Sequence, residues 1–182
     1  MTREQRTDGR ARFGLPEGKP VVLMVSAFIA SKKVADGIRA VAQVPDAHLV
    51  VAGDGPLRDE LHKLANEVLP GRFKQISVAS GDMPALYRSA DAFMHLSIDE
   101  SFGNVFVEAM ASGLPIVAFD TPRTRWIIGD DASFAPVDAP DALPPLIKVA
   151  LRRGSKPEAR AQDFGWPSIG AKYRDFFAEL IR

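Results

Sequence analysis

The chain has 182 residues, of which 46% are apolar and 25% charged, and its 23 basic side chains balance 23 acidic ones. This composition predicts one globular domain with a buried core, and it gives no indication of nucleic-acid binding. The absence of cysteine excludes a disulfide framework and thiolate chemistry, and it agrees with a reducing compartment.

Apolar strands alternate with amphipathic helices along the chain. In chain order, the predicted strand and helix pairs are 21–28 and 34–42, 48–53 and 57–68, 73–79 and 83–89, 91–97 and 104–112, 114–119 and 123–128, and 133–135 and 139–152. A final amphipathic helix has Pro167 near its first turn. The alternation predicts an α/β fold, a doubly wound parallel sheet of about six strands with helices on both faces.

In such a sheet, ligands bind outside the carboxyl ends of the strands, where the strand order reverses. The segments that follow the first five predicted strands are 27–33, 53–56, 80–84, 97–104 and 120–125. We therefore expect the functional residues in these loops.

Polar residues at the start of the chain (MTREQRTDGR) predict no signal peptide, and no apolar run approaches the ~20 residues of a membrane span. A cytosolic protein is the expectation. The locally basic segment 151–162 also suggests weak peripheral contact with the inner face of a membrane, and a solvated helix and loop is the alternative.

Several familiar sites are excluded by their missing residues. GDGP lacks the Gly-Lys-Ser/Thr ending of a P-loop, no G-x-G-x-x-G opens the first helix, and no D-x-D pair is present. His48, His62 and His95 do not have metal-ligand spacing, so we expect no metal and no cofactor. His95, in an apolar strand, is either a hydrogen-bonded structural residue or a substrate contact just before Ser97.

The segment DESFGNVFVEAMASGLP holds two glutamates, Glu100 and Glu108, separated by seven residues. Glu108 stands in an apolar run, where a buried carboxylate without a partner is costly. SIDESFGNVFVEAMASGLPIVAFDT is similar to the E-x7-E region of retaining, sugar-nucleotide-dependent glycosyltransferases of the GT-B fold, the large family numbered four. GLPEGKPVVLMVSAF, HLVVAGDGPLRDEL, MPALYRSADAFMHLS and DFGW extend the resemblance over residues 14–177.

The resemblance implies the C-terminal half of a two-domain enzyme. Residues 1–18 would be the interdomain linker, 19–165 the Rossmann-like nucleotide-sugar-binding domain, and 166–182 a C-terminal amphipathic helix. The N-terminal acceptor domain of the same enzyme would be the partner. The donor would be a nucleotide-diphospho-sugar, a UDP- or GDP-sugar, and this domain alone would bind it without turnover.

The resemblance also assigns roles to residues. Glu100 would contact hydroxyls of the transferred sugar, and Glu108 would accept hydrogen bonds from the ribose. Gly103 would let the backbone approach the ligand. Sugar and diphosphate oxygens would meet the amides at one helix N-terminus, those of Phe102, Gly103, Asn104 and Val105. Ser97 and Gly53 would also line the substrate site. A loop or cap carboxylate, an exposed helix residue and a plain turn glycine are the structural alternatives.

The leaving diphosphate needs cations. The family usually supplies a Gly-Arg pair after the first strand and a lysine five residues later, and here Ser26-Ala27 and Lys32 stand at those positions. The arginine is missing, which is not a neutral change, because a guanidinium grips phosphate with two bonds. Arg123 and Arg125 are candidate substitutes, and a solvated surface pair is the alternative.

The resemblance therefore implies the donor domain of a retaining glycosyltransferase, with Glu100 and Lys32 in catalytic roles. A non-catalytic GT-B-like binding or assembly module with impaired donor binding is an alternative, which Ala27 favours. A related epimerase or phosphorylase half-domain is a third reading, and the E-x7-E spacing disfavours it.

Overall fold

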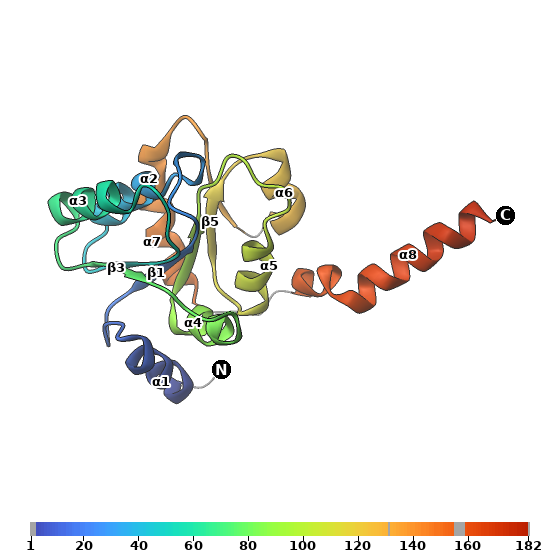
Figure 1. Ribbon diagram of the computed structural model, residues 1–182, viewed down its shortest axis with the longest axis horizontal. Helices are drawn as coiled ribbons and strands as arrows, with labels where there is room; N and C mark the ends of the chain where they lie inside the picture. The colour runs from blue at the N-terminus through green and yellow to red at the C-terminus, as the bar shows by residue number, and fades with distance from the viewer. Residues whose placement is uncertain (1–2, 131, 155–158, 182) are drawn as a thin grey trace.

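Figure 1 shows the computed structural model, which describes residues 3–130, 132–154 and 159–181. The described residues form one sheet of six parallel strands in the order β3-β2-β1-β4-β5-β6. The prediction of a Rossmann-like, doubly wound α/β fold is confirmed. The strands are β1 Val21–Val25, β2 His48–Ala52, β3 Phe73–Ile76, β4 Ala92–His95, β5 Ile116–Phe119 and β6 Ser133–Ala135.

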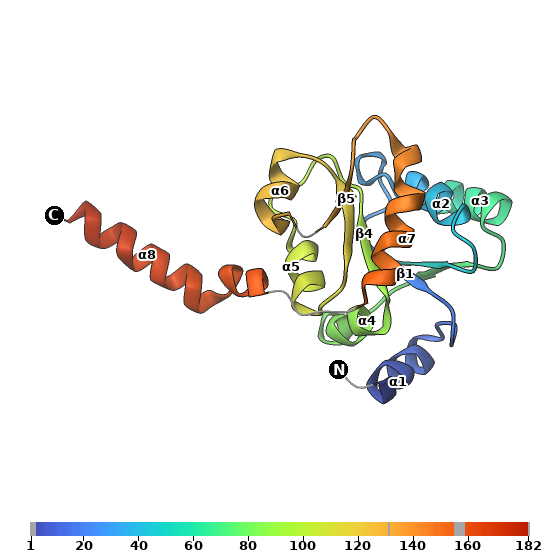
Figure 2. The same ribbon diagram turned by 180° about the vertical axis from the view of Figure 1, so that it is seen from behind.

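Helices cover both faces of the sheet, as Figures 1 and 2 show from opposite sides. One core lies between the sheet and α2, α3 and α7, and the other lies between the sheet and α4, α5 and α6. The helices are α1 Arg3–Phe13, α2 Val34–Ala42, α3 Arg58–Val68, α4 Met83–Ser89, α5 Asn104–Ala111, α6 Pro122–Ile128, α7 Leu143–Arg153 and α8 Trp166–Leu180. Short 3-10 turns are η1 Ala30–Lys32, η2 Ser80–Asp82, η3 Pro140–Ala142 and η4 Ala159–Phe164.

The four central strands, β2, β1, β4 and β5, are mostly continuous apolar runs because both of their faces are buried. In β1, Val22 and Met24 belong to the core under α2, α3 and α7, whereas Val21 and Leu23 belong to the core under α4, α5 and α6. All four side chains are fully buried. This pattern is typical of a parallel sheet whose crossover helices cover both sides.

The first strand ends at Val25, three residues before the predicted end of its apolar run. The chain nevertheless stays beside the neighbouring strand, because the amide of Ser26 donates to the carbonyl of Ala52 at 3.0 Å. Gly53 makes this approach feasible, since a Cβ at that position would lie 1.9 Å from the carbonyl oxygen of Ser26. The loops after β1 and β2 are therefore held side by side.

Helix α1 lies in the segment assigned to the interdomain linker, where the sequence predicted no helix because its charged residues show no apolar stripe. It packs against α4 and is anchored by Arg10, whose side chain is 8% exposed. Arg10 donates to the carbonyls of Ser89, Pro16 and Lys19 at 3.0–3.1 Å and pairs with Asp91 at 2.6 Å. The hydrogen bonds and the ion pair of this buried arginine therefore attach α1, which has no apolar stripe, to the rest of the domain.

The helix α8 extends away from the body of the domain in both views (Figures 1 and 2). It contacts η4, which in turn packs against α5. Among the helices of the described residues, none combines the length and the apolar character that crossing a bilayer requires. Within the locally basic segment 151–162, residues 155–158 lie outside the described part of the chain.

The strand order places the point of reversal between β1 and β4, which are neighbours at the centre of the sheet. The chain leaves β1 toward β2 and β3, and it later crosses back to build β4, β5 and β6 on the other side. The crevice outside the carboxyl ends of β1 and β4 is the usual ligand position in such sheets. The loops at 26–33 and 96–103 meet there.

Candidate functional site

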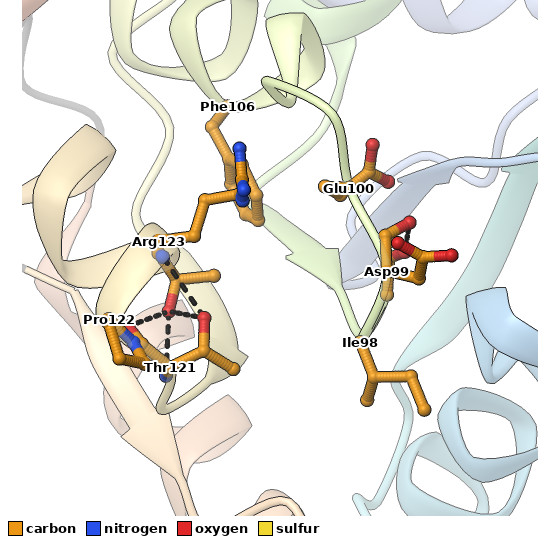
Figure 3. Close-up of a pocket in the computed structure, with 9 residues that line it drawn as sticks. Ile98, Asp99, Glu100, Phe106, Thr121, Pro122 and Arg123 are labelled. Carbon is orange, nitrogen blue, oxygen red and sulfur yellow. Dashed lines mark hydrogen bonds between the residues drawn. The ribbon is translucent and has the colours of Figure 1, made fainter.

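A cavity of about 300 Å³ opens at the carboxyl ends of β4 and β5. Figure 3 shows Ile98, Asp99 and Glu100 on one of its sides and Thr121, Pro122 and Arg123 on the other, with Phe106 of α5 between them. Ser97 and Thr124 complete the lining. This volume is at the lower end of the range of small-molecule sites. Two of the five loops expected from the sequence, 97–104 and 120–125, therefore border one cavity.

Glu100 is the centre of a hydrogen-bonded group that joins three segments of the chain. Its Oε1 accepts from Lys32 Nζ of η1 at 2.5 Å and from His95 Nε2 of β4 at 2.7 Å. The backbone holds the two loops together as well, because the amide of Ile98 donates to the carbonyl of Ser31 at 3.2 Å. The structure thus brings together the two residues expected to act in catalysis, at the reversal of the strand order.

These contacts keep Glu100 ionised. The hydrogen bond from His95 is the main cause, and with the bond from Lys32 it lowers the pKa of Glu100 to about 2 against the opposing effect of partial burial. The side chains of Glu100 and Lys32 are only 15% and 18% exposed. At neutral pH the group therefore presents a carboxylate, which can only accept hydrogen bonds, beside an ammonium.

Glu108, on α5, is exposed, so its carboxylate does not bear the cost of burial that its apolar neighbours suggested. Its Oε2 accepts a hydrogen bond from the phenol of Tyr87 on α4 at 2.7 Å. Tyr87 is fully buried, and this burial together with the bond to Glu108 raises the pKa of its phenol far above the usual value. One partner of Glu108 thus comes from the fold, and the carboxylate still faces solvent.

The helix α5 begins directly after a glycine, in the loop that contains Glu100. Gly103 is its N-cap, with φ +92°, and a Cβ there would lie 2.9 Å from the ring of Phe106. Only glycine adopts this conformation in this space without strain. Asn104 and Val105 form the first turn of the helix. Phe102 turns away into an aromatic cluster, with ring centroids 6.1 Å from Trp126 and 5.5 Å from Phe164.

The candidate cations differ in their surroundings. Arg123 lines the cavity and donates to the carbonyl of Ser101. Arg125 forms two bonds with Asp120, at 2.8 and 2.9 Å, a third with Asp130 at 3.2 Å, and lies over the ring of Phe134. These carboxylates raise the pKa of Arg125. The guanidinium of Arg125 is therefore already paired, and the cavity lining contains Arg123 instead.

The two remaining candidates, Ser97 and Gly53, each form a hydrogen bond that involves a backbone carbonyl. Ser97 is buried, lines the cavity and donates to the carbonyl of Asp99 at 3.1 Å. Gly53 lies after β2, outside this cavity lining, and its carbonyl accepts from the side chain of Gln75 at 2.8 Å. Ala27, in the position of the missing arginine, is exposed after the end of β1. Space for a larger side chain is therefore open to solvent there.

The sequence did not indicate which protein groups pair with the two glutamates, Tyr87 with Glu108 and His95 with Glu100. Tyr87 was given no role beyond its place in the short predicted helix 83–89, although a buried tyrosine generally needs a partner for its hydroxyl, which is the signal that was available. For His95 the sequence allowed a hydrogen-bonded structural role or a substrate contact, but it did not identify the hydrogen-bond partner. That partner is Glu100, which the loop after β4 brings back to the end of the strand. No group of three or more His, Asp or Glu side chains in the described residues is arranged to hold a metal ion.

Comparison with known proteins matches residues 5–163 to the family described as Glycosyl transferases group 1. Among curated proteins, the chain is 34% identical over 134 residues to the lipopolysaccharide core biosynthesis glycosyltransferase LpsE of Rhizobium meliloti, covering 73% of this chain and 39% of LpsE. It is 28% identical to the alpha-monoglucosyldiacylglycerol synthase of Streptococcus pneumoniae, covering 71% and 31%. The chain thus spans well under half of these two relatives.

Solved structures share the fold. Sucrose-phosphate synthase from Thermosynechococcus elongatus superposes with a TM-score of 0.78 at 28% identity, over 95% of this chain and 49% of that one. HepE of Anabaena, solved in complex with UDP and glucose, superposes with a TM-score of 0.81 at 23% identity. That alignment covers 98% of this chain and 53% of HepE, so the matched part again corresponds to about half of a longer protein.

Proposed function

This chain belongs to the glycosyl transferases of group 1, and on that premise we propose that it is the donor-binding domain of a retaining glycosyltransferase. The domain would bind a nucleotide-diphospho-sugar for transfer to an acceptor held by an N-terminal domain of the same enzyme. One observation carries the proposal. Glu100 pairs with Lys32 at the reversal of the strand order and lines one cavity with Arg123, in the loop that precedes the helix bearing Glu108.

The two glutamates suit the two sugars of such a donor. An ionised carboxylate accepts hydrogen bonds from adjacent hydroxyls, so Glu100 is proposed to hold the transferred sugar. Glu108 is proposed to hold the ribose through the oxygen that does not accept from Tyr87. UDP and glucose are the molecules named in the HepE complex, which supports a UDP-sugar as the first donor to test.

The reaction we propose is glycosyl transfer with retention at the anomeric carbon. Its demand on the protein is to position the donor and to stabilise the negative charge that develops on the departing diphosphate. Lys32, Arg123 and the amides at the start of α5 are the proposed groups for that charge. Glu100 acts here by orienting the sugar, and a covalent glycosyl-enzyme is not required.

The acceptor domain is proposed to meet this chain along α8. The large side chains of that helix are strongly exposed, from 55% for Phe176 and Phe177 to 84% for Trp166. The rings of Tyr173 and Phe176 both contact that of Phe177, and an exposed apolar cluster of this kind is typical of a contact site. Hydrogen exchange tests the idea, because α8 amides are expected to exchange several-fold more slowly in a two-domain enzyme than in this chain. Equal exchange would count against the contact.

Calorimetric titration tests donor binding. UDP, GDP, UDP-glucose and GDP-mannose are added separately to the wild-type chain. At least one nucleoside diphosphate and its sugar form, either UDP with UDP-glucose or GDP with GDP-mannose, are expected to bind saturably. Glu108→Ala should weaken the nucleoside diphosphate and its sugar form alike, by about tenfold, because the ribose is common to both. Glu67→Ala, an exposed glutamate on α3, is the matched control and should leave both affinities unchanged.

The alternative, a binding or assembly module without donor binding, is favoured by one observation, Ala27 in the place of the phosphate-gripping arginine. Absence of binding to all four ligands would support it. Ala27→Arg then separates two causes. If the site is intact and lacks only this cation, the variant should bind the diphosphates at least tenfold more tightly. If the loop serves another purpose, the variant will behave as the wild type does.

A further inference from the structure

We infer that His95 is a positioning residue for the sugar-binding carboxylate, and this inference rests on the proposed function. His95 is the last residue of β4 and is only 2% exposed. Its Nε2 lies 2.7 Å from Oε1 of Glu100, five residues further along in the loop that borders the cavity. The loop carboxylate is thereby tied to the most central part of the sheet.

The imidazole is itself held firmly. The ring of Phe93 lies parallel to it, at 7° and 6.2 Å between centroids, and the ring of Phe106 meets it edge-on at 5.1 Å. Phe106 also lines the cavity. Binding groups gain accuracy when their supporting residues are locked by packing on regular elements. His95 has that support, whereas Glu100 in the loop does not.

The direction of the hydrogen bond is set by chemistry. The ionised carboxylate cannot donate, so Nε2 carries the hydrogen and Glu100 accepts. Lys32 Nζ donates to the same oxygen, Oε1. The second oxygen, Oε2, receives neither of these two bonds, and we assign it to a hydroxyl of the transferred sugar. Two donors on one oxygen from separate segments fix the rotation of the carboxylate.

The packing of the ring by itself does not explain a histidine here. Its Nδ1 is buried and has no hydrogen-bond partner among the described residues. An unpaired buried polar atom is unfavourable, and an apolar side chain between Phe93 and Phe106 would avoid it. The residue therefore has its explanation in what it does to Glu100.

The test compares how tightly the chain binds a nucleotide sugar and the corresponding nucleoside diphosphate. The measured quantity is the dissociation constant of the nucleotide sugar divided by that of the nucleoside diphosphate. UDP-glucose is compared with UDP, and GDP-mannose with GDP. Only the sugar form reaches Glu100. His95→Leu is therefore expected to raise this ratio about tenfold and to leave nucleoside diphosphate affinity unchanged. His95→Gln, whose amide nitrogen reaches the place of Nε2, should restore the wild-type ratio.

Controls distinguish positioning from general damage. Met94→Ala, at the position before His95 in β4, opens a cavity in the core on the opposite face of the sheet, and it should lower the unfolding midpoint without changing the ratio. In a Glu100→Ala background, His95→Leu should change the ratio no further, because the two residues act as one unit. If His95→Leu does not fold, His95→Asn replaces it, since its shorter amide misses Oε1 and should raise the ratio where Gln does not.

Three results would overturn the inference: an unchanged ratio in His95→Leu, equal weakening of both nucleotides, or additive effects with Glu100→Ala. A wild-type chain that binds none of the four ligands would instead refute the proposed function, and the inference with it. The two failures are thus separate.

Discussion

Glu100→Gln should change stability in a way that depends on pH. The variant keeps the shape of the side chain but removes the charge that Lys32 and His95 surround. In the folded protein the pKa of Glu100 is about 2, against an ordinary value of 4.5. A carboxyl whose pKa is lower in the folded state stabilises the fold above its unfolded pKa, and this stabilisation is lost as the pH falls toward about 2.

The magnitude follows from that difference. At about 1.4 kcal/mol for each pH unit, the shift corresponds to at most roughly 3–4 kcal/mol. Glu100 and Lys32 remain partly open to water, at 15% and 18% exposure, so solvent screening reduces the contribution. We expect Glu100→Gln to lower the free energy of unfolding by about 1–2 kcal/mol at pH 7.

Urea unfolding of both proteins, followed by tryptophan fluorescence at pH 7, 5, 4 and 3, measures this difference. The difference in unfolding free energy between wild type and Glu100→Gln should be largest at pH 7, begin to decrease below about pH 4.5, and decrease steadily toward pH 3. Glu67→Gln, on the exposed face of α3, should show no such difference. A difference of constant size across this range, or a variant more stable than the wild type at pH 7, would refute the assigned electrostatics.

Three further changes test other parts of the structure. Arg10→Met removes the guanidinium that pairs with Asp91 and donates to three carbonyls, and it should cost about 3 kcal/mol and lower Tm by roughly 6–12 °C in thermal circular dichroism; a loss below ~1 kcal/mol would contradict the anchoring of α1. Gly53→Ala should destabilise by ~2 kcal/mol or more in urea unfolding, because its Cβ meets the Ser26 carbonyl, whereas Gly81→Ala, in open space, should stay within ~0.5 kcal/mol. Arg123→Met should weaken calorimetric binding of nucleoside diphosphates by about tenfold and Arg125→Met by less than twofold, and the reverse order would exclude Arg123 as the phosphate contact.

The fold was predictable because its signals are local. Continuous apolar strands, helical stripes and glycine turns each depend on residues near one another in the chain, and their alternation fixes the class of fold. The helix α1 was missed for the same reason. This helix is attached to the domain through Arg10, whose partner Asp91 lies 81 residues away in the chain. No pattern within the helix predicts that ion pair.

The candidate site was predictable in its residue types but not in its pairings. The spacing predicted Glu100 in the loop before a helix and Glu108 on that helix, and the structure places them in the loop before α5 and on α5. Their partners within the fold, His95 and Tyr87, are set by how loops and helices pack after folding. A sequence pattern can propose a carboxylate for a ligand, but the protein groups that orient that carboxylate are decided by tertiary packing.

The charges around the cavity explain why position 27 matters for the whole proposal. Glu100 and Lys32 neutralise each other, and Asp99 and Arg123 bring one further charge of each sign to the lining. The formal sum is zero, while a nucleoside diphosphate carries at least two negative charges. Such a balance holds a sugar by hydrogen bonds but contributes little attraction for the diphosphate. An arginine at position 27, just after the carboxyl end of β1, would add a positive charge to that balance, and Lys32, whose charge Glu100 offsets, would then share the diphosphate with a second cation.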